Sequence, residues 1–319
     1  MLVQSNLPKK YLRFPEPFKR MSRINRIVYS LVGLILSPVY WGLAYFVKTP
    51  GLAFRGLCAV KGLHMLLSER DLVHAYNFLV SPLDSVRYFE FDFMWKAIKK
   101  MEIHSYLDVS SPRLLPLMVV DQSGGIQAEL INPDRKDLPT TVYLAKSFGI
   151  ESKCKFHEAR IEDMQFEDNS FDLITSMSVI EHIPDDVGAI RKMWELLKPG
   201  GVLLISLPCA ATASEEYTNL NDYELIDTDE NGFVFWQRYY DDLLLKERVY
   251  SITGLPRNFQ VYGEKNEGSY NQNVVEKRSD PFYPTWREPF MVGQQFELKD
   301  RVSELPGMGV IAMEFLKPV

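Results

Sequence analysis

Apolar and polar positions change their period near residue 100. Before that point, between Leu52 and Lys100, apolar residues recur at mixed spacings of three and four, which predicts helices. After it, short apolar runs alternate with amphipathic stretches. Five of these runs predict strands: Tyr106–Val109, Ile126–Ile131, Lys155–His157, Asp172–Ser176 and Val202–Leu207. Strands that alternate with helices indicate a parallel sheet with right-handed crossovers, and such sheets bind ligands at the carboxyl ends of their strands.

The last third of the chain continues this pattern with a long interruption. It predicts a helix at Tyr239–Ile252 and strands at Asn258–Gly263 and Gly309–Phe315. The segment Glu264–Pro306 between these strands is too long for a hairpin turn, and its aromatic residues argue against disorder. If strand 258–263 runs parallel to the earlier strands, this insertion leaves the sheet at the carboxyl ends and covers the ligand site.

The first 61 residues are basic, with Glu16 as their only acid. Within them, Ile27–Val47 carries no charge and is long enough to cross a bilayer, although Pro38 predicts a kink in its middle. Three alternatives stay open: a membrane-spanning helix, a segment that lies in one leaflet, and an apolar helical cap of a soluble protein. Spanning fits least, because the arginines before the run hold its amino-terminal side in the cytoplasm, where a cofactor-dependent domain must also lie.

The overall composition is typical of a folded globular protein. A net charge of −6 gives no reason to expect a nucleic-acid partner. The three cysteines lie far apart and the five histidines are scattered, so we expect reduced thiols in the cytoplasm and no metal site. Peripheral contact with a membrane through residues 1–60 is the alternative to a purely cytoplasmic location. The sequence does not indicate an oligomeric state.

Three blocks of sequence carry a family resemblance. They are Phe166–Ile174, Val179–Ile183 and Leu197–Gly201, and they predict a buried strand, a polar elbow and a Pro-Gly-Gly break before the next strand. In sequence and in spacing they resemble the class I S-adenosylmethionine-dependent methyltransferases that act on small molecules. The resemblance implies an α/β fold with a doubly wound, mixed, seven-stranded sheet. Residues 101–319 would form this Rossmann-like domain, behind a helical extension of residues 1–100.

The cofactor half of the sequence departs from this family. Where the family has alternating glycines after the first strand, the chain has Ser110-Ser111-Pro112, and Pro112 fixes φ and removes a donor. Asn132 stands where the family has an acid for the ribose hydroxyls, and Arg160 stands where it has an acid for the adenine amino group. Asp134 is the expected substitute for the first acid. The substitute for the second is one of Glu158, Glu162 and Asp163.

The resemblance implies S-adenosylmethionine as the cofactor, held by residues at the ends of the strands and in the loops that follow. These residues are Asp108, Ser110, Ser111, Asn132, Asp134, Ile161, Ser176 and Met177. We expect Asp108 to accept backbone N–H groups of the cofactor turn, and the two serines to offer their hydroxyls. An ordinary structural turn is the alternative for all three.

His182 is the candidate general base, because it lies at the carboxyl end of the fourth strand and an imidazole titrates near neutral pH. Its alternative role is to cap the next helix. Tyr283 and Trp286 of the insertion, together with Tyr239, are the candidate substrate contacts. Packing in the core is the alternative for Tyr239, which belongs to an aromatic cluster that begins at Phe233.

The sequence therefore predicts methyl transfer to a small-molecule, sugar or lipid-like acceptor. Two alternatives stay open. One is a methyltransferase fold without catalysis that serves as a binding or scaffold subunit, and the other is a fold that binds a different nucleotide-like ligand. A cavity beside Ser110 that is open favours a ligand, and one that is filled by side chains favours a scaffold.

Overall fold

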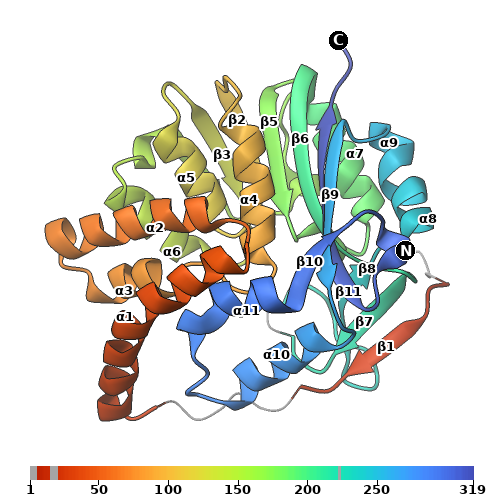
Figure 1. Cartoon of the computed structure of the whole chain (residues 1–319). Helices are drawn as coiled ribbons and strands as arrows, with labels where there is room; N and C mark the ends of the chain where they lie inside the picture. Colours follow the sequence, from red (N-terminus) through yellow and green to blue (C-terminus); the bar gives the residue numbers. More distant parts are fainter. Residues whose placement is uncertain (1–5, 15–20, 222–223) are drawn as a thin grey trace.

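The computed structural model describes residues 6–14, 21–221 and 224–319 (Figure 1). A central sheet of eight strands has the order β10-β9-β11-β6-β5-β2-β3-β4. Strands β2 to β6 are parallel, and β11 runs antiparallel to both β6 and β9. The strands are β2 Ser105–Val109, β3 Gln127–Ile131, β4 Cys154–His157, β5 Phe171–Met177, β6 Leu197–Ala210, β9 Asn258–Glu264, β10 Phe296–Lys299 and β11 Met308–Leu316.

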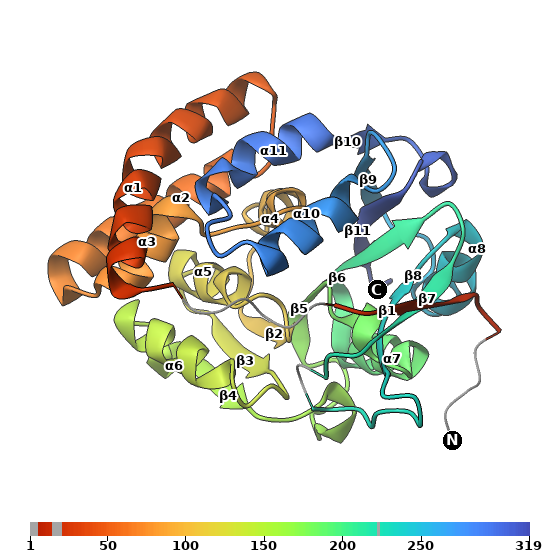
Figure 2. The same ribbon diagram turned by 90° about the horizontal axis from the view of Figure 1, so that it is seen from below.

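This topology confirms the predicted doubly wound, mixed sheet and adds β10 as an eighth strand. The chain moves outward from β2 to β3 and β4, and then returns to the other side of β2 with β5. The strand order therefore switches between β2 and β5, and the carboxyl ends of these strands are where such a sheet binds ligands. Since β9 is parallel to β6, the insertion after Glu264 leaves the sheet at this same edge, as predicted. Figure 2 views the molecule from this edge.

Helices cover both faces of the sheet. Side chains of α2, α4, α5 and α6 share one apolar core with alternate residues of the strands, such as Tyr106 and Leu173. Helix α7 and the segment α8 to α9 share the other core with the intervening residues, such as Leu107 and Ile174. This alternation is the period-two pattern of strands that are buried on both faces. The helices are α4 Arg87–Ile98, α5 Leu114–Gln122, α6 Leu138–Ser147, α7 Asp186–Leu196, α8 Asp242–Leu245 and α9 Ser251–Thr253, with the π-helical η5 Lys246–Tyr250 between the last two.

The amino-terminal helices pack on the same body as the sheet. They are α1 Arg23–Phe46, α2 Leu52–His64, the π-helical η1 Met65–Glu69 and α3 Leu72–Val80. Helix α1 lies along helix α11 (Glu288–Gln295) and the 3-10 turn η6 (Thr285–Arg287) of the insertion. The insertion also contains α10 (Ser269–Ser279), which lies on the carboxyl-end side of the sheet (Figures 1 and 2). Residues from the two ends of the chain thus build one cap.

A second, three-stranded sheet lies beside the carboxyl ends, with β7 (Ser214–Thr218) between β1 (Lys9–Leu12) and β8 (Val234–Tyr239). The sequence pattern did not predict these strands, and it placed Tyr239 in a helix that in fact begins at Asp242. Four shorter 3-10 turns complete the described elements: η2 Glu151–Lys153, η3 Ile161–Asp163, η4 Ile180–His182 and η7 Val302–Glu304.

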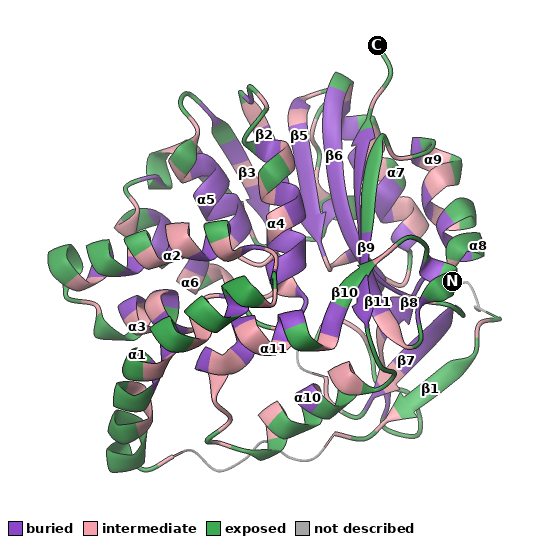
Figure 3. Cartoon of the chain, viewed as in Figure 1, coloured by how far each residue is buried: buried purple, intermediate pink, exposed green. Residues whose placement is uncertain are grey.

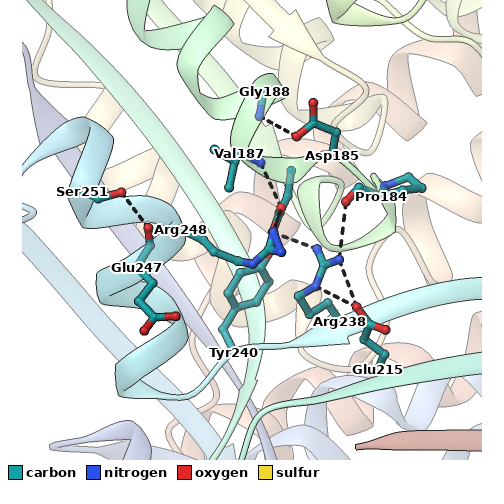
Figure 4. Close-up of polar contacts among 11 residues, drawn as sticks. Pro184, Asp185, Val187, Gly188, Glu215, Arg238, Tyr240, Glu247, Arg248 and Ser251 are labelled. Atoms are coloured by element: carbon teal, nitrogen blue, oxygen red, sulfur yellow. Dashed lines mark hydrogen bonds and ion pairs between the residues drawn. The ribbon is translucent and has the colours of Figure 1, made fainter. Parts of the chain in front are cut away.

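A buried ionic cluster joins the second sheet to α7 (Figure 4). Asp186, at the start of α7, is fully buried and accepts a hydrogen bond from the Tyr240 hydroxyl at 2.6 Å. The Arg238 guanidinium lies 2.8 Å from the Asp186 carboxylate and 3.1 Å from that of Glu215 on β7. Arg248 also pairs with Asp186. Because each buried charge has an opposite partner, the cluster fixes β8 against the loop that precedes α7.

Candidate functional site

A cavity of about 1230 Å³ lies at the carboxyl ends of the parallel strands. The loops that follow β2, β3, β4 and β5 form one part of its wall. The segment between α3 and α4, strand β8 and helix α10 form the other part. The volume exceeds the roughly 300–1000 Å³ of ordinary ligand pockets, so it has room for two ligands side by side.

The turn after β2 approaches this cavity closely. Ser110 has a left-handed backbone with φ of 55°, a conformation that favours glycine. Its backbone N–H and its hydroxyl both donate to the carbonyl of Ile131, at 2.9 Å and 3.1 Å. Pro112 lies two residues before α5, where a missing N–H removes no helical hydrogen bond, and its carbonyl accepts from the backbone N–H of Leu115. The serine-proline sequence therefore forms a tight turn without the family's glycines, and the cavity beside Ser110 is open.

Asp108 is the support of this turn, as predicted. Its carboxylate accepts from the backbone N–H of Ser111 at 3.1 Å and from the Thr175 hydroxyl at 2.6 Å. Burial raises the pKa of Asp108 to about 6, against the lowering effect of these hydrogen bonds. Ser111 in turn accepts from the backbone N–H of Met177 at 3.0 Å. These contacts tie the ends of β2 and β5 together.

Ser176 and Met177 lie behind the cavity rather than on its wall. Both side chains are fully buried, and the Ser176 hydroxyl donates to the carbonyl of Val109. The two side chains that were predicted to contact the cofactor therefore do not line the cavity. The physical reason is that β5 continues straight to Met177, and the chain turns toward the cavity only at Ser178, where φ is 47°.

Three residues after β3 form a polar wall, and one of them was missed from the sequence. Asn132 accepts from the backbone N–H of Asp134 at 2.9 Å and donates to Asp137 at 3.1 Å. Asp137 also pairs with Arg113 of the turn after β2. All four residues line the cavity. Since both ends of the Asn132 amide are occupied, the carboxylates of Asp134 and Asp137 are the stronger acceptors for ligand hydroxyls here. Asp137 resembles a helix N-cap in the sequence, although it makes no cap hydrogen bond.

The loop after β4 supplies the next part of the wall. Arg160 lines the cavity and donates to the carbonyl of Leu225 at 2.5 Å, so its guanidinium holds a neighbouring loop. The buried side chain of Ile161 and the carboxylate of Glu162 line the cavity as well. Glu158 instead pairs with Arg135. Of the three acids proposed to replace the family's adenine acceptor, Glu162 is the one that reaches the wall.

Glu181 and His182 belong to the 3-10 turn η4, which follows the carboxyl end of β5, and both line the cavity. His182 Nδ1 donates to the carbonyl of Trp236 on β8, which leaves Nε2 as the acceptor. Desolvation lowers the pKa of His182 to about 4, so the imidazole is neutral at pH 7. Burial raises the pKa of Glu181 to about 8, and its Oε2 has no hydrogen-bond partner among the described residues. His182 thus remains a candidate base, and Glu181 becomes a second candidate whose pKa lies closer to neutral pH.

A buried cluster on α4 was not predicted. Glu90 is fully buried and accepts from Ser178, from the Ser206 hydroxyl at 2.6 Å and from Arg87 at 2.9 Å. Arg87 and Ser178 line the cavity, so the cluster positions charged and polar groups beside Glu181. A carboxylate and a guanidinium three positions apart in an aromatic-rich helix were the available sequence signal, because buried carboxylates are rare unless they are paired.

The aromatic candidates separate into two places. Tyr239 lines the cavity, and its hydroxyl accepts from Gln237 at 3.0 Å. Tyr283 and Trp286 do not line it: the Tyr283 carbonyl accepts from Tyr29 on α1, and the Trp286 ring lies 4.7 Å from that of Tyr29. The insertion reaches the cavity through Tyr270 and Arg278 of α10 instead. Trp286 is buried and Tyr283 is half-buried, and both contact α1 instead of the cavity.

No cluster of three or more metal-ligating side chains occurs in the described part of the chain. Its three cysteines are free and buried. The side chains that line the cavity carry carboxylates, hydroxyls, guanidinium groups and aromatic rings.

Comparison with known proteins identifies part of this site. Residues 131–205 match the family model described as "Methyltransferase domain". Phosphoethanolamine N-methyltransferase 1 of Arabidopsis thaliana is 30% identical over 149 residues, which are 45% of this chain and 30% of that protein. A ubiquinone biosynthesis O-methyltransferase of Xanthomonas oryzae pv. oryzae is 39% identical over 71 residues, which are 21% of this chain and 30% of that protein.

The chain thus spans about 30% of the length of the curated relatives that it matches. Among solved structures, coclaurine N-methyltransferase bound to N-methylheliamine and SAH is 11% identical, with a TM-score of 0.49 and 71% of each chain covered. The matched segment 131–205 runs from the end of β3 into β6 and contains Asn132, Glu162, Glu181 and His182.

Proposed function

Because residues 131–205 match a methyltransferase domain and the cavity lies where such a fold binds its cofactor, we propose that the chain transfers a methyl group from S-adenosylmethionine to a small-molecule acceptor. One observation carries this proposal. A single cavity runs from the turn after β2, at Ser110, to the end of β5, at Glu181, and crosses the point where the strand order switches.

The residues on one half of the cavity fit the cofactor. The open space beside Ser110 lies next to the carboxylates of Asp134 and Asp137, which can accept from the two ribose hydroxyls. Glu162 and Ile161 lie further along the wall, where a carboxylate and an apolar side chain suit an adenine ring. When bound, S-adenosylmethionine supplies an electrophilic methyl group on a sulfonium. The acidic half of the cavity complements that positive charge.

The other half of the cavity fits an acceptor. Glu181, His182, Tyr239, Tyr270 and Arg87 face it from four different elements. A neutral His182 offers Nε2 as an acceptor for the proton of a hydroxyl or amine. Glu181 offers a carboxyl group that can gain or lose a proton near neutral pH. Methyl transfer depends chiefly on alignment of nucleophile, methyl group and sulfur, so the main task of these side chains is positioning.

We infer an acceptor with an oxygen or nitrogen nucleophile and an apolar portion, of the sugar, aromatic or lipid-like class. The polar groups of this half lie beside Phe91, Met308 and Val310, which provide an apolar wall. The two relatives are named for N-methylation of a phosphorylated amino alcohol and for O-methylation in ubiquinone synthesis. These names support the two nucleophile classes without choosing between them.

A methyl-transfer assay tests the proposal. The full chain is incubated with methyl-labelled S-adenosylmethionine and a panel of phosphoethanolamine, a polyprenyl phenol, a monosaccharide and a fatty acid. We expect labelled product with at least one acceptor. Tyr270→Ala should then lower kcat/KM about tenfold or more, because it removes a side chain from the acceptor half. Phe282→Ala is the matched control, since Phe282 belongs to the same insertion but is exposed. Equal loss in both variants would contradict this placement.

A fold that binds without catalysis is the second candidate. It is favoured by the contacts of Asn132 and Arg160, which both make internal hydrogen bonds where the family presents acids to the cofactor. Binding of S-adenosylhomocysteine without turnover of any acceptor in the panel would support this candidate over the enzyme.

A further inference from the structure

Helix α1 has two faces of opposite character. The inner stripe is formed by small residues, and Gly33, Ser37 and Ala44 are its buried members. The outer stripe recurs at spacings of three, four and seven, as one face of a helix does, and consists of large apolar residues: Ile24, Ile27, Leu31, Ile35, Val39 and Phe46. These side chains are all more than half exposed, and Ile35 and Phe46 are 72% and 81% exposed. Figure 3 shows exposed residues along the outer side of α1.

The inner face is attached to the rest of the protein along the length of the helix. Near its start, the Tyr29 hydroxyl donates to the carbonyl of Tyr283. In its middle, a Cβ at Gly33 would collide with the Tyr76 hydroxyl, and Ser37 accepts from Arg55 at 2.7 Å. Just beyond its end, Thr49 donates to the carbonyl of Pro289 at 2.6 Å.

These attachments bear on the three alternatives that the sequence leaves open for this segment. The helix is long and apolar enough to cross a membrane. Most of it is also exposed, because only 17% of the residues in its most apolar stretch are buried in the protein. Crossing a bilayer would require it to leave α3, η6 and α11, to which it is attached. A soluble cap accounts for the inner stripe, yet it leaves the outer stripe in water. Monomeric proteins rarely expose an apolar strip of this size without a partner.

The charges around the strip select the partner. Arg23 and Arg26 are exposed at its amino-terminal end, and Lys48 is exposed just past its carboxyl-terminal end. The sequence contains no acid from Met21 through Ser68. Beyond α1, the same cap exposes further apolar side chains, among them Val60, Leu67, Leu72 and Val73. An apolar strip with a basic rim is complementary to an anionic leaflet, where apolar side chains enter the acyl region and bases meet phosphates.

We propose that the outer face of α1 is a docking surface for an anionic lipid leaflet, on which the helix lies parallel to the membrane plane. The attachment is monotopic: the inner stripe stays on the protein, and the outer stripe enters the interface. This proposal rests on the surface of α1 alone and does not depend on the reaction that the cavity catalyses.

Vesicle flotation of the full chain tests it. Vesicles of phosphatidylcholine with 30% phosphatidylglycerol are compared with vesicles of phosphatidylcholine alone. We expect the protein to float with the anionic vesicles and to dissociate partly at high salt. Ile35→Glu and Phe46→Glu should each lower the partition coefficient about tenfold, since each removes one aliphatic or aromatic side chain from the lipid. Arg26→Glu should lower binding only to the anionic vesicles, about fivefold or more.

Two controls keep the test specific. Leu243→Glu and Leu255→Glu change similarly exposed apolar residues in and beside the segment α8 to α9, which covers the other face of the sheet, and we expect them to float like the unchanged protein. Thermal unfolding of every variant establishes that it is folded. The proposal is overturned if the unchanged protein stays out of both vesicle fractions, or if the control variants lose as much binding as Ile35→Glu. Light scattering without lipid tests whether a second copy of the chain binds this face instead. If the protein is a dimer that Ile35→Glu dissociates, and it does not bind vesicles, the face is a dimer interface and the proposal is overturned.

Discussion

At the residue scale, the cavity holds ionisable groups in unusual states. Glu181 is buried, and its pKa lies near 8, while the pKa of the neighbouring His182 lies near 4. At neutral pH both are therefore largely uncharged. Environments that push neighbouring pKa values apart in this way are frequent at functional sites, because they make one group available to accept or hold a proton.

The pH dependence of stability tests the state of Glu181. Its folded pKa of about 8 lies above the ordinary value of 4.5, so its protonated form favours the folded state. This contribution is full below about pH 4.5 and is lost as the pH rises toward 8. Glu181→Gln should remove that loss, so that the variant gains a few kcal/mol relative to the unchanged protein between pH 5 and pH 8.5. Urea unfolding at the two pH values measures the difference. Glu267→Gln, an exposed control, should retain the original slope, and an identical slope for Glu181→Gln would contradict the raised pKa.

At the element scale, one buried carboxylate anchors the start of the insertion to the sheet. Glu264, at the end of β9, is buried and accepts from the backbone N–H groups of Gly268 at 3.2 Å, Tyr270 at 2.5 Å and Met308 at 2.9 Å. It therefore joins the start of α10 to the start of β11. Since Tyr270 and Met308 both line the cavity, the same carboxylate shapes the acceptor half.

Removing this carboxylate should loosen the insertion. Glu264→Ala leaves three backbone donors without their acceptor, and we expect a loss of roughly 2–4 kcal/mol in the free energy of unfolding. Amide exchange at Tyr270 and Met308 should accelerate at the same time. Glu264→Gln retains one acceptor oxygen and should lose less. Glu267→Ala, in the same loop, should stay within about 0.5 kcal/mol, and protection of both amides that is unchanged in Glu264→Ala would refute the role.

The elements also show what the sequence pattern could predict. Strands β2 to β5 and β9 lie within one or two residues of their predicted positions, because buried runs between turn residues are a strong local signal. Strand β6 is longer than predicted, since it continues through Leu197–Gly201 and on to Ala210. Strand β1 was missed because it pairs with β7, more than 200 positions away, and such pairing leaves no local period. Strands β7 and β8 pair locally, but β7 buries polar residues such as Glu215 and Glu216, so no apolar alternation marks it.

The candidate site was predictable to a similar degree. Asp108 and Ser110 could be assigned from their place after the first strand, and His182 from its place after the fourth. Asp137 and Arg113 come together only through the fold, and the fold also places the local Arg87–Glu90 pair of α4 beside the cavity. Tyr283 and Trp286 were misplaced because an aromatic residue in an insertion can face the cavity or the body of the protein, and the packing of α1 decides between the two.

At the scale of the whole molecule, the sheet, the second sheet and the cap surround one cavity. The α/β sheet supplies the half with Ser110, Asp134 and Asp137, while β8, α4 and the insertion supply the half with Tyr239 and Tyr270. The proposed membrane face of α1 belongs to the same rigid cap, because α1 packs on the insertion. Docking on a leaflet would thus hold the acceptor half at a fixed distance from lipid. The central claim remains that the first half binds S-adenosylmethionine.

Titration calorimetry with S-adenosylhomocysteine tests that claim most directly. We expect the folded, full chain to bind one molecule of S-adenosylhomocysteine. Asp134→Ala should raise the dissociation constant about tenfold or more, because it removes a charged acceptor for the ribose hydroxyls. Asp300→Ala, at an exposed position outside the cavity, should bind like the unchanged protein. No heat of binding at millimolar ligand, with the protein shown to be folded, would contradict the account.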